Sequence, residues 1–321
     1  MKPVFHHRPV NGPFEDPSVY VRVLHEKKGL LFDAGDVPGL SARELMKITD
    51  VFITHTHIDH FIGFDTIIRI LLKRAAPVTF YGPEGIIKCI TGKLDGYTWN
   101  LITEYPLVVN AVEIRRDIIL KASFRAGEEF TCVDTGFIDY TPTVLDTPLF
   151  YVNAVILEHD VPSLGFYIKE KKHINIDKAR LTGRGFSVGP WLNRLKDLIR
   201  GRKFDDVLDT GNGCYRVSEL EDIYSITEGQ KLSYIMDSSP VDSNIKSIID
   251  FVNGSDSLYI EAYFMHKELD RARERNHLTA RISGQIARRA CVKNLHLLHF
   301  SPRYRETPEC LVKEALEEFR H

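Results

Sequence analysis

The chain has 321 residues, of which 43% are hydrophobic and 27% are charged, and its formal net charge is -2. This length and composition predict a folded globular protein and exclude a disordered chain. Because the net charge is close to zero, nucleic-acid binding through the charge of the whole molecule is excluded. Any such partner would need a local basic patch.

The first residues of the chain and its five cysteines indicate the cellular compartment in which the protein is expected. Residues 1–9 are polar and include two prolines, unlike a signal peptide, and no apolar run reaches the roughly 20 residues of a membrane span. We therefore expect a cytoplasmic protein with no membrane partner. The odd number of cysteines and the absence of a CxxC pair predict reduced structural thiols, not a disulfide framework or a cysteine zinc site.

In chain order, the first predicted elements are two short strands, Ser18 to His25 and Gly29 to Phe32. The second strand leads directly into Asp33, at a turn of small residues. A short helix is predicted from Ser41, its N-cap, to Ile48.

The next segment carries four side chains of metal-ligand type within six positions, in the order Thr54-His55-Thr56-His57-Ile58-Asp59-His60. Residues 51–54 predict a buried strand and residues 61–72 an amphipathic helix, so the ligands are expected on the loop between them. Imidazole and carboxylate groups suit zinc and its first-row neighbours. The alternative is a polar turn whose histidines only cap and solvate.

Two metal ions fit this loop, because His55 and His57 can face one ion while Asp59 and His60 face a second. Residues 77–81 then predict a strand, followed by a turn and a helix that begins near Ile86. Residues 105–114 and 118–133 predict several short β segments, and the stretch 110–147 has no functional interpretation.

Residues 151–158 predict a buried strand that ends at His159. A histidine at such a strand end can supply the missing ligand of the first metal, or it can belong to the turn alone. Residues 231–236 predict another buried strand, which ends at Asp237. The two oxygens of this carboxylate can reach both metals.

Between these two strands, residues 165–205 carry eleven basic and four acidic side chains, a net charge of +7. The aromatic residues Phe186 and Trp191 are interleaved with the basic ones. This composition predicts an inserted, exosite-like arm that contacts phosphates. The alternative is an ordinary solvated face.

The last third of the chain carries two more histidines at the ends of predicted elements. His277 follows a charged helix predicted over residues 264–276, and His299 follows the buried strand predicted over residues 294–298. The other elements predicted here are a strand over 257–261 and helices over 243–252, 280–290 and 307–319. The order of strands and helices predicts an α/β protein, a single domain over 1–321 built as a four-layer αββα sandwich with the inserted basic arm.

Together these residues predict two metal sites that share Asp237. The ligands are His55, His57 and His159 for the first, and Asp59, His60 and His299 for the second. His277 precedes His299 by 22 positions. The order and spacing of these motifs resemble the ribonuclease Z family, the tRNA 3′-processing endonucleases of the metallo-β-lactamase superfamily. Further segments that carry the resemblance are Tyr81-Gly82-Pro83-Glu84-Gly85, His159-Asp160-Val161-Pro162, Gly189-Pro190 and Glu261-Ala262.

The resemblance implies a zinc-dependent phosphodiesterase, with two zinc ions per chain, that removes the 3′ trailer of precursor tRNA with a metal-activated hydroxide. Manganese or iron would suit the same ligands. It also implies a homodimer in which the arm of one subunit grips the RNA cut by the other. Asp33 would brace the metal loop without being a ligand, Asp59 would help activate the hydroxide, and His277 would assist the leaving oxygen. Substrate contacts are expected from Thr279, Ser301, Arg303 and Lys196.

The family pattern differs at two places near the substrate end of the site. The turn after the second strand reads Asp33-Ala34-Gly35-Asp36-Val37, and the usual His-Glu-Ala-Thr is replaced by Ile260-Glu261-Ala262-Tyr263. Two alternatives therefore stay open. One is a hydrolase of the same fold acting on a small phosphodiester or another ester, with the arm serving dimerisation. The other is an RNA-binding protein with a structural metal.

Overall fold

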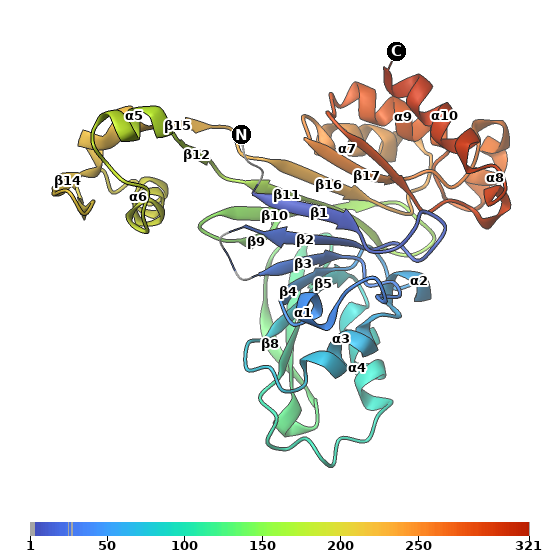
Figure 1. Cartoon of the computed structure of the whole chain (residues 1–321). Coiled ribbons are helices and arrows are strands. Elements are labelled where there is room, and N and C mark those ends of the chain that lie inside the picture. Colours follow the sequence, from blue (N-terminus) through green and yellow to red (C-terminus); the bar gives the residue numbers. More distant parts are fainter. Residues whose placement is uncertain (1–3, 25, 27, 321) are drawn as a thin grey trace.

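The computed structural model describes residues 4–24, 26 and 28–320. Within them, two β-sheets pack face to face and helices cover the outer face of each, as Figure 1 shows. The four-layer αββα sandwich expected from the sequence is confirmed. His25, the predicted end of the first strand, lies outside the described residues.

The first sheet has eight strands in sequence order, from β1 to β8. Its four middle strands, β3 to β6, are parallel, so their carboxyl ends lie along one edge. The strands are β1 (Phe5–Pro9), β2 (Val19–Val23), β3 (Gly29–Phe32), β4 (Ile48–Phe52), β5 (Val78–Pro83), β6 (Val108–Ile114), β7 (Ile118–Arg125) and β8 (Cys132–Asp139). Its outer face is covered by α1 (Ala42–Leu45), α3 (Phe64–Leu71) and α4 (Ile86–Asp95).

The predicted helix from Ser41 is α1, and its N-terminus is a capping box in which the side chains of Ser41 and Glu44 each bind the other's backbone N–H. The stretch 110–147, which had no interpretation, extends the first sheet through β6, β7 and β8. All eight residues of β8 are exposed, and this strand forms the edge of the sheet.

The second sheet has six strands in the order β18-β17-β16-β11-β10-β9. β16, β17 and β18 are parallel, and β11 runs antiparallel to β16 and to β10. The strands are β9 (Thr143–Asp146), β10 (Phe150–Leu157), β11 (Ser163–Glu170), β16 (Lys231–Ile235), β17 (Ser257–Glu261) and β18 (Leu295–Leu298). Its outer helices are α7 (Asp242–Val252), α8 (Leu269–Glu274), α9 (Ala280–Arg289) and α10 (Pro308–Arg320).

Aromatic side chains fill the space between the two sheets. Phe32 and Phe52 stack with ring centroids 5.0 Å apart, and the ring of Phe166 lies 5.5 Å from that of Phe52. All three side chains are fully buried. They fix strands β3 and β4 of one sheet against β11 of the other, and these strand ends carry the polar side chains of the site.

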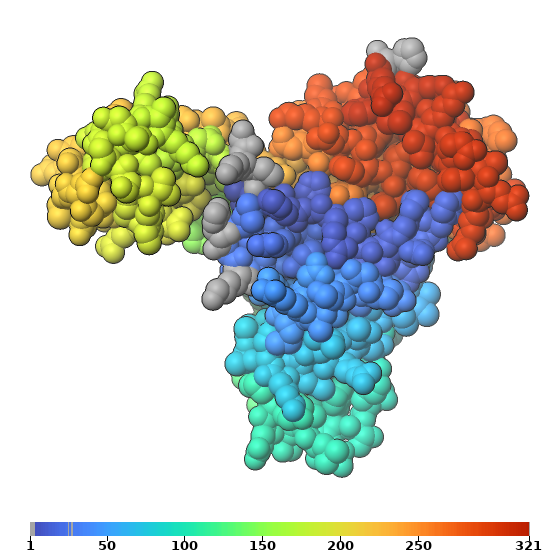
Figure 2. Space-filling model, in the orientation of Figure 1, coloured from blue at the N-terminus to red at the C-terminus, as the bar shows by residue number. Residues whose placement is uncertain are grey.

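The arm begins and ends later than residues 165–205. Residues 163–170 are the core strand β11, paired with β10 and β16, because their alternating apolar side chains pack between the sheets. The projecting segment comprises residues 171–230, seen as a separate lobe in Figure 2. Its elements are β12 (His173–Ile176), α5 (Lys178–Gly183), α6 (Trp191–Arg200), β13 (Val207–Asp209), β14 (Cys214–Arg216), η2 (Val217–Ile223) and β15 (Tyr224–Thr227).

The wider boundaries change the charge of the arm. Residues 171–230 contain eleven basic and nine acidic side chains, a net charge of +2. The returning half is acidic, and Arg184 forms an ion pair with Asp222 at 2.7 Å. Arg194, Arg202 and Lys203 are exposed and have no ion-pair partner within the described part of the chain. The basic character of the arm is therefore local to α6 and its C-terminal end.

Two predicted elements differ in detail. The helix expected over residues 61–72 begins earlier, as the single turn α2 (Ile58–Phe61), so Asp59 and His60 lie on a helix and not in a loop. The charged helix expected over 264–276 is broken into the 3₁₀ turn η3 (His266–Glu268) and the short α8. Nowhere in the described residues is there a helix with the length and apolar content needed to cross a membrane.

Candidate metal centre and general acid

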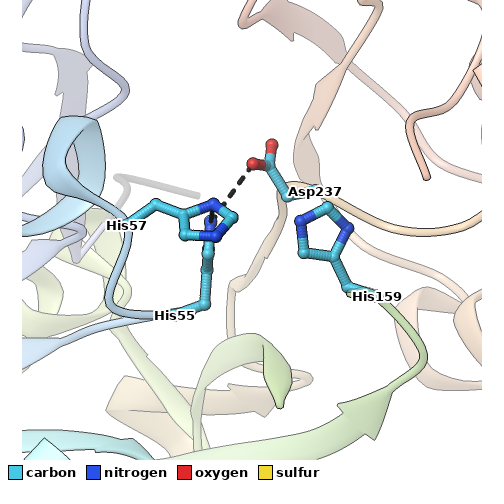
Figure 3. A group of neighbouring side chains, drawn as sticks. All are labelled: His55, His57, His159 and Asp237. Atoms are coloured by element: carbon cyan, nitrogen blue, oxygen red, sulfur yellow. Dashed lines mark hydrogen bonds and ion pairs between the residues drawn. The ribbon is translucent and has the colours of Figure 1, made fainter. Parts of the chain in front are cut away.

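Four of the predicted metal ligands meet at the carboxyl ends of strands from both sheets. His55 and His57 follow β4, His159 follows β10, and Asp237 follows β16. One ligand atom from each of these residues lies within 4.8 Å of the others, and Figure 3 shows the side chains converging. The His159 Nδ1–H donates to the carbonyl of Asn276 at 3.1 Å, which leaves Nε2 for a metal.

A second group adjoins the first. Asp59, His60 and His299 also bring one ligand atom each within 4.8 Å of the others. Asp237 lies between the groups, with Oδ2 3.3 Å from Nε2 of both His55 and His60. Its Oδ1 is 2.7 Å from Nδ1 of His299. The carboxylate is therefore placed to bridge two cations.

The unpaired atoms of this cluster test whether a metal fits. Among the described residues, His60 Nε2, Asp237 Oδ1 and His299 Nδ1 are buried yet have no hydrogen bond of acceptable geometry. Buried polar atoms without partners are costly, so each such atom needs an explanation. A divalent cation with nitrogen and oxygen ligands would satisfy all three, and the donor set is one that zinc accepts. The residues present fit a metal.

The electrostatics of the cluster point the same way. Burial, helped by the neighbouring His60, lowers the pKa of His55 to about 2, so its ring is neutral and able to bind a metal. Burial opposes protonation of His60 too, but Asp33 and Asp237 raise the pKa of His60 to about 10. His299 is also buried, and Asp237 raises the pKa of His299 well above its usual value. Without metal, protons on these two rings supply the positive charge that a cation would bring.

Asp33 is positioned to hold the metal loop in place. Its buried carboxylate accepts hydrogen bonds from the backbone N–H of Thr54 at 2.7 Å and from the Tyr234 hydroxyl at 3.0 Å. It also lies 2.8 Å from Nδ1 of His60. A carboxylate behind a ligand imidazole fixes the tautomer and the orientation of the ring. These contacts are those required of a brace that is not itself a ligand.

His277 is held by two residues of its surroundings. Its Nδ1 lies 2.8 Å from Oε2 of Glu261, and the ring of Tyr263 stacks on it with a centroid distance of 4.0 Å and an angle of 6°. Glu261 is fully buried at the end of β17, and its Oε1 accepts from the backbone N–H of Ser238 at 2.8 Å. Sequence reasoning quoted Glu261 but missed its role. The available clue was a glutamate that ends a buried strand, the position shared by the other site residues.

The four residues expected to contact substrate differ in their exposure and in their partners within the fold. Thr279 is buried and caps α9, accepting from the N–H of Ile282, and Ser301 is 3% exposed. Thr279 therefore has a role within the fold, and substrate contact by either residue stays a prediction. Arg303 is partly exposed but paired with Glu268 at 2.8 Å. Lys196 is half-buried on α6 of the arm.

The backbone is unusual at three of the site residues. Asp33, Asp237 and His299 have φ values of 53°, 47° and 55°, in the left-handed region that non-glycine residues seldom occupy. Each directly follows or nearly follows a buried strand, and the sharp change of direction aims its side chain at the cluster. Non-glycine residues with a left-handed backbone conformation are found preferentially at functional sites, where the surrounding structure holds them in place.

We compared the chain and its fold with known proteins. No family model matches the chain. The metallo-β-lactamase fold protein YhfI from Bacillus subtilis superposes with a TM-score of 0.55 at 15% identity, over 98% of this chain and 92% of that one. The chain therefore has the metallo-β-lactamase fold, with a cluster of histidines and aspartates that fits a metal at its strand ends.

Relatives in sequence narrow the class. Ribonuclease Z of Thermobifida fusca is 31% identical over 301 residues, which cover 89% of this chain and 80% of that protein. Ribonuclease Z of Deinococcus radiodurans is 28% identical over 281 residues, 86% of this chain and 83% of that protein. The chain belongs to the ribonuclease Z family. The family and enzyme class expected from the sequence are thereby confirmed.

Proposed function

We propose that this endoribonuclease removes the 3′ trailer from precursor tRNA. The observation that carries the proposal is the placement of His277, held by Glu261, beside two adjoining groups of metal ligands. Such a combination suits cleavage of a phosphodiester, in which one oxygen must be activated and another must leave with a proton. The relatives named Ribonuclease Z support tRNA as the substrate.

Two zinc ions per chain complete this proposal. His55, His57, His159 and Asp237 would hold the first, and Asp59, His60, His299 and Asp237 the second. When bound, the ions supply Lewis-acid activation of the phosphate and of water. The same nitrogen and oxygen ligands suit manganese or iron.

The protein's own groups handle the protons. Asp59 is partly exposed beside His60 and His299, and although burial acts in the opposite direction, these two rings hold its pKa well below the usual value. It therefore stays a carboxylate, able to accept a hydrogen bond from the attacking water and to orient it. In the ring protonated on both nitrogens, the Nδ1–H of His277 points to Glu261, and the Nε2–H is the proton that would pass to the leaving 3′ oxygen, leaving the neutral imidazole.

The position of the arm supports a homodimer in which each arm serves the partner's site. The arm leaves the body after Glu170 and returns at Lys231, whereas the site lies at the other ends of the same two strands, near His159 and Asp237. β11 has eight residues, and at a rise of roughly 3.3 Å per residue its first and last residues are about 23 Å apart. In Figure 1 the arm projects away from α2, which carries Asp59 and His60.

Substitutions in the arm test whether the substrate is precursor tRNA or a small ester. Replacing Arg194, Arg202 and Lys203 together by alanine removes exposed, unpaired cations and leaves the metal cluster untouched. We expect KM for precursor tRNA to rise on the order of 10-fold to 100-fold, and the dependence of binding on salt to become weaker, because fewer phosphates are neutralised. Hydrolysis of bis-p-nitrophenyl phosphate should be unchanged. The matched control is R288A with R289A, two exposed arginines at the end of α9.

Unchanged cleavage of precursor tRNA by the triple variant would favour the alternative, a hydrolase of a small phosphodiester or other ester. Mixed dimers test the sharing of arms. A subunit with H277A and an intact arm, combined with an arm-deleted subunit that keeps His277, should cleave precursor tRNA, although neither homodimer should. Inactive mixed dimers would contradict the proposal that each arm serves the active site of the partner subunit.

A further inference from the structure

The arm has a hydrophobic core of its own. The buried side chains of this core lie between residues 174 and 223, and they include Ile174, Leu195 and Val217. None of them belongs to the clusters that fill the body. Apolar packing therefore stabilises the lobe internally. The direction in which the lobe points must depend on the two chain segments that join it to the body and on the contacts between them.

The two joining segments form a ribbon that is interrupted at the junction. The ladder of the body ends at the pair Lys169 and Lys231, and the ladder of the arm begins at the pair His173 and Thr227. Between these ladders, residues 170–172 and 228–230 are joined by the backbone hydrogen bond from the Glu170 N–H to the Gln230 carbonyl at 2.9 Å, and the regular strand pairing stops there. A two-stranded ribbon bends most easily where its ladder is broken, so this is the hinge of the arm.

Glu170 spans the break. Its side chain is fully buried, and its two carboxylate oxygens lie 3.0 and 3.1 Å from Nδ1 of His173, the first paired residue of the arm. Oε2 also accepts from the backbone N–H of Gln230 at 3.3 Å, on the returning segment. A buried carboxylate is costly unless it is paired, so these partners are held firmly.

Gln230 carries the connection into the body. Its side-chain oxygen accepts from the backbone N–H of Phe5 at 2.9 Å, and its amide nitrogen donates to the Phe5 carbonyl at 3.3 Å. The Gln230 side chain thus binds both the N–H and the carbonyl of Phe5 in β1, the two groups that a neighbouring strand would bind. Gly229 makes the close approach possible, because a Cβ there would lie 2.1 Å from the Glu170 carbonyl oxygen. The junction is therefore tied to β11, to the returning segment and to β1.

The arm helix α6 also contributes a charge to the junction. Burial, followed by repulsion from Arg200, lowers the pKa of the Lys196 ammonium, and Glu170 acts in the opposite direction by attraction. Lys196 was expected to contact substrate. That expectation stays a prediction, and Lys196 is half-buried on α6.

We infer that Glu170, His173 and Gln230 form a brace across the interrupted ribbon, which fixes the direction of the arm and so positions it to hold RNA at an active site. The second part of this inference rests on the proposed function. The three residues are positioning residues, since they lie at the opposite end of β11 from the metal cluster. Their removal should change how the arm is presented and not the chemistry.

The direction of the arm can be measured without RNA. Cys214 on β14 of the arm and Cys291 on the body are exposed, so spin labels on these two residues, with C89S, C132S and C310S, report their separation. E170A should broaden the distribution of distances between the labels. The control is E228A, which removes an exposed carboxylate at the same junction, the partner of Lys169. E228A should leave the distribution narrow.

Kinetics separate the two parts of the inference. With precursor tRNA, E170A should raise KM on the order of 10-fold and leave kcat nearly unchanged, since the loss is in binding and not in the chemical step. Turnover of bis-p-nitrophenyl phosphate should not change. A broadened distribution with an unchanged KM would support the brace and overturn the role of the arm in holding RNA.

An unchanged distribution in E170A would overturn the brace itself. If E170A does not fold, Q230A gives the same test, because it removes the connection to Phe5 and leaves the carboxylate paired with His173. A narrow distribution in Q230A would then overturn the inference, and a broadened one would support it.

Discussion

Glu261 holds His277 by a contact of 2.8 Å between Oε2 and Nδ1, at the end of a buried strand and directly beside the metal cluster. A carboxylate in this position fixes the orientation of the imidazole and leaves its other nitrogen available. The two residues should therefore act as one unit, and their substitutions should not be additive.

The first prediction follows from this pair. E261Q should lower kcat for precursor tRNA on the order of 100-fold, and H277A on the order of 10² to 10⁴-fold, with metal content and fold retained. The double variant should be no slower than H277A alone. E274Q, on the exposed face of α8, is the control. Additive losses in single-turnover experiments would show that Glu261 does not act through His277.

The second prediction concerns the bridging position of Asp237. D237A should lower the content of both metals, because its two oxygens face both groups of ligands. H159A should empty only the first site, although either change should abolish turnover. Elemental analysis of the purified variants measures this difference, with H266A as a control outside the cluster. Two metals per chain in D237A would contradict a bridging carboxylate.

The third prediction concerns Asp33. D33N keeps the shape of the side chain but removes the charge that faces His60 across 2.8 Å. The affinity for zinc should fall on the order of 10-fold to 100-fold, as expected for the partner behind a ligand imidazole. Competition with a chromophoric chelator gives the affinity, and circular dichroism checks the fold. An affinity equal to that of the wild type would reduce Asp33 to a turn residue.

The fourth prediction is a pH dependence away from the metals. Burial, with repulsion from His296 and His6, lowers the pKa of His7 to about 4 from 6.5. The folded state therefore resists protonation, so the contribution of neutral His7 to the free energy of unfolding is complete above pH 6.5 and is lost as the pH falls from 6.5 toward 4. H7F should lose less free energy of unfolding than the wild type between pH 7 and pH 5.

Urea unfolding at each pH measures this difference, and H266A, which changes a histidine of the distant turn η3, is the control. The comparison isolates His7 because the titration of the metal ligands is common to all three proteins. Parallel curves for H7F and the wild type would show that His7 does not contribute to acid destabilisation.

The grouping of the metal ligands could be predicted from the sequence because each ligand follows a buried apolar strand. His55, His159, Asp237 and His299 all have this position, and strands that run in the same direction bring such residues to one edge. The strand pattern also predicts the two sheets and the four layers. What it does not contain is the pairing of Glu261 with His277, because the partner of a buried carboxylate is chosen by tertiary structure.

The arm was harder to predict for the same reason. Residues 165–205 contain most of core strand β11 and the basic part of the arm, whereas the acidic returning half of the arm lies beyond them. Hydrogen bonding between distant segments sets the boundary, as at Glu170 and Gln230. Thr279 shows the local form of this ambiguity, because a threonine after a histidine motif has the same appearance whether it caps a helix or contacts a ligand.

The left-handed backbone at Asp33, Asp237 and His299 has a consequence for the evolution of this protein. Each of these conformations costs on the order of 1 kcal/mol, and glycine or asparagine would adopt them more easily. Selection for heat resistance alone, with no demand for RNA cleavage, would therefore favour glycine or asparagine at these three positions. Their persistence in a thermostable variant would be a record that catalysis had been selected alongside stability.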